Sequence, residues 1–150
     1  MTHIERTIDI AAPPEKVFEE LTDLHHLHRW STITASHEGP DEKLRAGHEF
    51  RQNLRIAGVS LPTTWRCTEC DPPRLVAYEA QSPGGGSLTM RQTVVPTDGG
   101  SKVELVVDYE LPGSFLGELL DRLYVERRNE REAQHSLENL KDLLEGRPPA

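Results

Sequence analysis

The chain has 150 residues and a formal net charge of -8, with 28% of its residues charged and 35% hydrophobic. A chain of this size forms one domain that buries roughly 70% of its unfolded surface, so we expect residues 1–150 to be a single domain with a frayed tail at 147–150. The acidic balance argues against a nucleic-acid partner, which needs a basic face, and no apolar run approaches the ~20 residues of a membrane span.

The chain begins with a half-buried strand that is followed by two short helices. From His3 to Ile10, apolar and polar residues alternate, as in a strand with one buried face. A Pro-Pro pair suits the start of a helix, where a missing N–H costs nothing, and we predict this helix from Pro13 to about Thr22. A second short helical segment, Leu24 to Arg29, leads to Trp30.

Six further strands follow, separated by turns rich in glycine and proline. We predict these strands at Ile33–Ser36, His48–Ile56, Thr63–Cys70, Leu75–Ala80, Leu88–Val95 and Lys102–Leu111. The turns are predicted at Gly58–Pro62, Asp71–Pro73, Gly84–Gly86 and Asp98–Gly100. Strands joined by such short turns pair antiparallel.

The last third of the chain is predicted as one long helix, from Ser114 to about Glu145, which only Gly117 interrupts. Its leucines recur at helical spacing, at Leu116, Leu119, Leu120, Leu123, Leu137, Leu140 and Leu144. Continued through the middle of the helix, the same stripe carries Arg127, Glu130 and Gln134. Either this middle is solvated, with Arg127 and Glu130 paired across one turn, or it borders a polar cavity that holds a ligand.

Together these elements predict an α+β domain, because the strands run through tight turns while the helices stand apart from them. The sheet needs a cover for its apolar face, and only the C-terminal helix is long enough to provide it. We therefore predict a helix-grip fold, in which a curved antiparallel sheet of about six to seven strands wraps around that helix. Inward polar groups on the helix would leave a space between helix and sheet.

Four short segments carry a resemblance to a known superfamily. They are Ala12–Phe18 (APPEKVF), Asp23–Trp30, Asp71–Leu75 (DPPRL) and Leu137–Lys141 (LENLK). Together with the order of elements, they resemble the START-like helix-grip superfamily, and within it the bacterial polyketide cyclase/dehydrase-like (SRPBCC) small-molecule-binding proteins. The resemblance implies a hydrophobic cavity between sheet and long helix, open near the short helices. It implies no particular chemistry, because the superfamily spans lipid carriers, pigment binders and aromatase/cyclases.

The resemblance also implies which residues line the cavity, and strand parity puts most of them inward. The strands and short helices would contribute Trp30, Phe50, Gln52, Leu54, Trp65, Tyr78, Met90, Gln92, Leu105, Val107 and Tyr109. The long helix would add Leu123, Arg127, Glu130 and Gln134. Ordinary core packing is the alternative role for each apolar member. Glu130, Tyr78 and Tyr109 are weak candidates for acid–base work, and no catalytic residue is assigned.

Two further motifs have simple alternatives, and we expect no metal or other cofactor. His25 and His28 could share a metal with Asp23 if they lie three apart on a helix, but an exposed helix explains them as well. Cys67-Thr68-Glu69-Cys70 has CxxC spacing, yet residues three apart in a strand point to opposite faces, which argues against a redox pair or zinc site. Without a disulfide framework or an apolar signal-peptide core, the expected location is the cytoplasm.

The predicted function is the binding of a small, largely apolar ligand, lipid- or polyketide-like, in the cavity between the sheet and the C-terminal helix. One alternative is a polyketide cyclase, aromatase or dehydratase that uses the same cavity. Another is a protein-interaction module that docks a partner through the long helix or a sheet edge.

Overall fold

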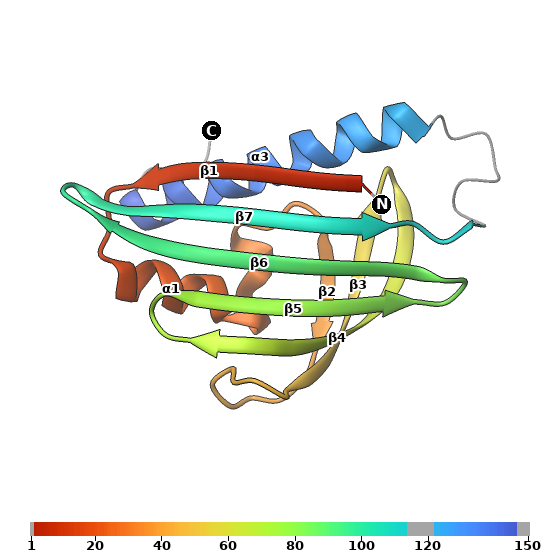
Figure 1. The fold of residues 1–150 in the computed structure, drawn as a ribbon, viewed down its shortest axis with the longest axis horizontal. Coiled ribbons are helices and arrows are strands. Elements are labelled where there is room, and N and C mark those ends of the chain that lie inside the picture. Colours follow the sequence, from red (N-terminus) through yellow and green to blue (C-terminus); the bar gives the residue numbers. More distant parts are fainter. Residues whose placement is uncertain (1, 114–121, 147–150) are drawn as a thin grey trace.

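The computed structural model describes residues 2–113 and 122–146, and Figure 1 shows their arrangement. The predicted order of elements and the α+β helix-grip fold are confirmed. The elements are β1 (Thr2–Ile10), α1 (Pro14–Thr22), the 3-10 helix η1 (Leu24–Arg29), β2 (Thr34–Glu38), β3 (Glu49–Ile56), β4 (Val59–Asp71), β5 (Leu75–Ser82), β6 (Gly86–Thr97), β7 (Gly100–Glu110) and α3 (Arg122–Glu145).

The strands form one antiparallel sheet in the order β1-β7-β6-β5-β4-β3-β2. Strands β2 to β7 follow one another as neighbours, while β1 crosses over to pair with β7. In Figure 1, β5, β6 and β7 lie along the long axis, β2 and β3 run across it, and β4 bends between the two directions. A bulge in β4, between Cys67 and Glu69, accompanies this bend. The sheet is therefore strongly curved and has one face that can enclose a core.

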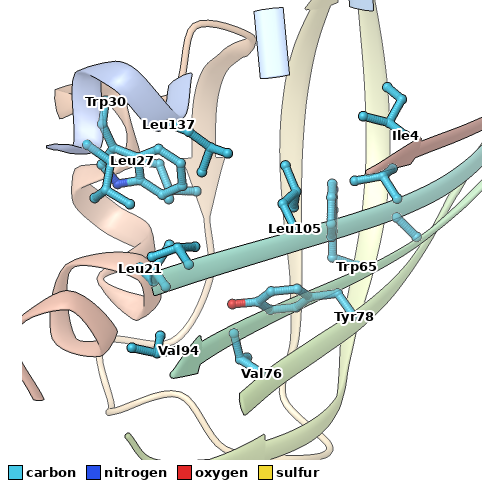
Figure 2. Close-up of a cluster of buried hydrophobic side chains, with 14 of the residues drawn as sticks. Ile4, Leu21, Leu27, Trp30, Trp65, Val76, Tyr78, Val94, Leu105 and Leu137 are labelled. Carbon is cyan, nitrogen blue, oxygen red and sulfur yellow. The ribbon is translucent and has the colours of Figure 1, made fainter. Parts of the chain in front are cut away.

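The core lies between this face and the helices α1, η1 and α3. Burial alternates strictly along β3 and β7, so every second side chain of these strands faces the helices. Figure 2 shows Tyr78 of β5 pointing toward the side where Leu21 of α1 and Leu137 of α3 lie. The predicted inward faces of the strands are confirmed, because they follow from the two-residue period of the backbone alone.

Hydrogen bonds hold the second half of α3 against the segment that follows η1. The Thr32 backbone N–H donates to Ser136 Oγ at 3.0 Å, and Asn139 Nδ2 donates to the Trp30 backbone oxygen at 3.2 Å. Leu137 and Leu140 are 2% and 0% exposed, so both predicted core leucines are confirmed. These contacts place Trp30 between η1 and α3.

The predicted turn at Gly58–Pro62 is wrong, because the β3–β4 hairpin turns on two residues only. Ala57 and Gly58 have φ of 50° and 82°, the left-handed conformation that a two-residue hairpin loop requires. Strand β4 therefore starts at Val59, and Pro62 lies within it opposite Asn53. The strand predicted at Ile33–Ser36 is likewise shifted, to β2, by a few residues.

The predicted inward face of the long helix is also wrong in its first half. Leu123 is 52% exposed, whereas Val125 is fully buried. At 100° per residue, the line through Leu140 and Ala133 continues to Asn129, and the stripe extended from Leu123 lies roughly a quarter turn to one side. The extrapolation failed because small and polar residues occupy the inward line here, so leucine spacing no longer marks it. Leu116, Leu119 and Leu120 lie outside the described residues.

Candidate ligand-binding cavity

Two adjoining chambers lie between the sheet and the helices. The first, called here the α3 chamber, has a volume of about 130 Å³ and reaches Asn129 and Ala133 of α3. The second, called here the η1 chamber, has a volume of about 90 Å³ and reaches Leu27 and Trp30 beside η1. Both are bounded by the same six side chains, namely Ile33, Leu54, Trp65, Leu88, Met90 and Leu105. The two chambers are therefore neighbouring parts of one cavity.

In the α3 chamber, Tyr109, Asn129 and Thr63 have hydrogen-bond partners within the protein, whereas Ser82 Oγ is buried without one. Tyr109 hydroxyl accepts a hydrogen bond from Asn129 Nδ2 at 3.0 Å. Thr63 Oγ1 accepts from Trp65 Nε1 at 2.7 Å and donates to the Gln52 backbone oxygen at 2.7 Å. The remaining wall of this chamber is largely apolar, with Glu110 and Glu132 among its lining residues. It is a surface for apolar contact.

An aromatic cluster forms part of the η1 chamber. Phe50 and Trp65 are stacked with ring centroids 5.9 Å apart, and Tyr78 meets each ring edge-on at 5.8 Å. Such offset and edge-to-face pairs are favourable beyond their buried area, so these rings form a rigid wall. Figure 2 shows the Tyr78 hydroxyl pointing toward the side where Leu21 and Leu27 lie.

Three polar atoms of the η1 chamber are buried without a hydrogen-bond partner. They are Trp30 Nε1, the Tyr78 hydroxyl oxygen and Gln92 Oε1. Their residues are only 6%, 5% and 7% exposed. Burial, and then the nearby Cys67, raises the pKa of Tyr78 well above 10, so its hydroxyl keeps its proton at neutral pH.

The eleven residues predicted from the strands and short helices all line one chamber or both. The α3 chamber takes Val107 and Tyr109, the η1 chamber takes Trp30, Phe50, Gln52, Tyr78 and Gln92, and both take Leu54, Trp65, Met90 and Leu105. Their contact with a ligand remains a prediction. Sequence reasoning missed Ile4 and Leu88, although their parity put them on the inward face. It also missed Asn129 and Ala133, which no apolar pattern marked.

The four residues predicted from α3 do not line the chambers. Arg127, Glu130 and Gln134 border a separate surface groove with Arg6 of β1, and Arg6 Nη2 lies 3.4 Å from Glu130 Oε2. Leu123 points away from the core, as described above. The polar stripe of the helix therefore meets the edge strand and solvent. Glu130 lies outside the cavity in which an acid–base group would have to act.

Near the short helices, a wider outer groove of about 640 Å³ lies against the η1 chamber. Leu24 and Phe50 line both spaces and so form the wall between them. His37 lies over Phe50 with ring centroids 5.2 Å apart, and its Nδ1 is 3.2 Å from Gln52 Nε2. Burial, and then the neighbouring His25, lowers the pKa of His37. The groove lies where the family resemblance implies the cavity opening.

The bulge in β4 overturns the expectation that the two cysteines point to opposite faces. Because the register shifts between Cys67 and Glu69, Cys67 is fully buried and Cys70 also packs against the core. Burial, and then the proximity of Cys70, raises the pKa of the Cys67 thiol to about 11. A thiol that stays protonated is a poor nucleophile.

The histidines of η1 contact different groups and share no common partner among the residues that the structure describes. His25 Nε2 lies 2.9 Å from the Pro40 backbone oxygen, while His26 Nδ1 lies 2.9 Å from Asp23 Oδ2. Within residues 2–113 and 122–146, no group of three or more His, Cys, Asp or Glu side chains could hold a metal ion. In the same part of the chain, no helix is both long and apolar enough to cross a membrane.

Comparison with known proteins gives one family over most of the chain. The sequence pattern of the family described as "Polyketide cyclase / dehydrase and lipid transport" matches residues 1–145. A Mycobacterium tuberculosis protein named only as uncharacterized is 33% identical over 110 residues, covering 70% of this chain and 74% of that protein. Another protein of that species, named a toxin, is 25% identical over 117 residues, covering 77% and 80%.

Solved structures share the fold. The Zhui aromatase/cyclase of a Streptomyces species superposes with a TM-score of 0.76 at 24% identity, over 96% of this chain and 93% of that one. A Thermus thermophilus protein gives a TM-score of 0.77 at 23% identity, over 95% and 97% of the two chains.

Proposed function

The chain belongs to the polyketide cyclase/dehydrase and lipid transport family, and from this premise we propose that it binds a small, largely apolar molecule in the α3 and η1 chambers. The main support for this proposal is that the two chambers share a wall, since Trp65, Met90 and Leu105 line both of them. A lipid- or polyketide-like ligand would gain ~25 cal/mol for each Å² of apolar surface that it buries there.

Ordinary packing does not account for this space. Protein interiors are close-packed and contain few voids larger than a water molecule, because unfilled volume forfeits dispersion contacts. Chambers of about 130 and 90 Å³ are several times larger than the roughly 10–15 Å³ that one water needs on this measure. Keeping such space empty costs stability, which supports a role in holding a ligand.

A pair of adjacent substitutions on β7 tests the proposal. Leu105 faces both chambers, whereas Val106 follows it on the opposite face of the strand and lines neither. Leu105→Trp should fill the common space and abolish binding of naphthalene, measured by titration calorimetry. Val106→Trp adds the same side chain outside and should leave binding intact, with circular dichroism checking that both variants fold. Equal binding by the two variants would contradict the proposal.

Native mass spectrometry of the protein purified from its own host provides a second test. A retained molecule that is absent from Leu105→Trp would identify the natural ligand. The comparison needs no prior choice of ligand, and it separates a cavity occupant from one bound to the surface.

A cyclase-type enzyme in the same cavity is the second candidate. The observation in its favour is the protonated Tyr78 hydroxyl, which could donate to a carbonyl oxygen of a poly-β-keto chain. Among the described residues that line the η1 chamber, however, there is no carboxylate or imidazole to take a proton in return. Turnover of a polyketide thioester that is lost in Tyr78→Phe would favour the enzyme over the binder.

A further inference from the structure

The polar groups of the η1 chamber are of two kinds, those with a hydrogen-bond partner in the protein and those without one. Ser31 and Thr34 hydroxyls lie 2.9 Å apart and satisfy each other, and the Gln52 side-chain nitrogen lies 3.2 Å from His37. In contrast, the Trp30 indole N–H, the Tyr78 hydroxyl and the Gln92 side-chain oxygen have no partner. Gln92 Nε2 has only a weak contact, with Met90 Sδ at 3.6 Å.

Unpaired buried polar atoms are costly, and folded proteins hold very few of them. Two of the three residues, Tyr78 and Gln92, come from the neighbouring strands β5 and β6 and line one chamber of about 90 Å³, so their unpaired atoms point to a group that is bound there. The Tyr78 ring is held in place, since it packs on Phe50 and Trp65 at 5.8 Å. Figure 2 shows the Trp30 nitrogen apart from the Tyr78 hydroxyl, so Trp30 is not part of this pair.

The chemistry of the Tyr78 and Gln92 atoms specifies the bound group. An amide oxygen can only accept a hydrogen bond, and a phenol can donate or accept one. A hydroxyl both donates and accepts, so it complements the acceptor at Gln92 and the donor at Tyr78. A carboxylate would leave the Gln92 oxygen facing an acceptor.

The lack of charged side chains in the chamber lining also indicates a neutral ligand group. The described residues that line the η1 chamber include no Lys, Arg, Asp or Glu, so no opposite charge is available to pair with an ionised ligand. Burying an unpaired charge in such a site costs several kcal/mol in free energy of binding. The buried end of the ligand must therefore be neutral.

Resting on the proposed function, we infer that the η1 chamber binds the hydroxyl end of a neutral apolar ligand through Tyr78 and Gln92, while its apolar body extends into the α3 chamber. This assigns the polar end of the site to β5 and β6, not to the charged stripe of α3.

Three probes of one shape test the inference: naphthalene, β-naphthol and β-naphthoate, titrated calorimetrically at neutral pH. We expect β-naphthol to bind about tenfold more tightly than naphthalene, as one or two net hydrogen bonds allow, and β-naphthoate to bind more weakly than both. The conservative variants Tyr78→Phe and Gln92→Leu should each remove much of the gain, so that β-naphthol and naphthalene bind to each variant with similar affinities. Tyr124→Phe, at a tyrosine that is 46% exposed, is the matched control and should change neither affinity.

The outcomes are distinct. If naphthalene binds and β-naphthol binds no better, or if β-naphthoate binds best, the hydroxyl site is refuted while the proposed function stands; water would then be the partner of the two atoms. If none of the probes binds, and native mass spectrometry shows no retained molecule, the proposed function fails and the inference with it.

Discussion

Removing the Tyr78 hydroxyl should stabilise the empty protein. Tyr78→Phe keeps the ring and its contacts with Phe50 and Trp65 and deletes only an oxygen that is buried without a partner. An unsatisfied buried polar group costs ~1–3 kcal/mol, and we take the lower end of this range because the chamber has room for water. The free energy of unfolding should therefore rise by about 1 kcal/mol, and Tm by roughly 2–4 °C for a chain of this length.

Urea unfolding followed by tryptophan fluorescence measures this change, provided that the m-value stays constant. Two other tyrosines serve as references. Tyr109→Phe removes a hydroxyl that accepts from Asn129, so it should lower the free energy of unfolding by about 1 kcal/mol. Tyr124→Phe changes an exposed side chain and should have an effect below about 0.5 kcal/mol. A loss of more than about 0.5 kcal/mol in Tyr78→Phe would refute the reasoning, since its hydroxyl would then have a partner in the empty protein.

Three further predictions concern the inward face of α3, the buried Cys67 thiol and the Glu130 carboxylate. Val125→Ala should lower the free energy of unfolding in urea by about 2 kcal/mol, because this side chain is fully buried. Leu123→Ala should lower it by less than about 0.5 kcal/mol, because Leu123 is half exposed, and equal losses would show that the inward face of α3 is assigned wrongly. Stability should fall as pH rises from 9 toward 11, because Cys67 releases its proton in the unfolded chain before it does so in the folded one, and Cys67→Ala should flatten that decline in urea unfolding at stepped pH. Glu130→Gln should change stability by less than about 1 kcal/mol and leave naphthalene affinity unchanged in calorimetry, since its pair with Arg6 is partly exposed to solvent and lies outside the cavity.

Much of the cavity wall could be predicted from the sequence. Alternation along β3 and β7 determines which side chains face the helices, because successive residues of a strand point to opposite faces whatever surrounds them. Phe50, Leu105 and Tyr109 were placed in this way, and the structure puts all three in the chambers. The family resemblance then supplied the relation between sheet and helix that periodicity alone does not contain.

The first half of α3 shows why the helix face was harder to predict. A helix turns 100° per residue, so a shift of one position moves the inward line by more than a quarter turn. At Asn129 and Ala133, the chamber is bounded by small and polar side chains, and the face is decided by contact with the sheet.

Local sequence thus determined the elements, their order and the inward faces of the strands, because backbone periodicity and turn chemistry act over a few residues. Only the tertiary structure decided the rotation of α3, the bulge that turns Cys67 and Cys70 toward one core, and the burial of Trp30, Tyr78 and Gln92 without partners. Those features depend on which distant groups fill or fail to fill the space around a side chain, and no local pattern encodes that.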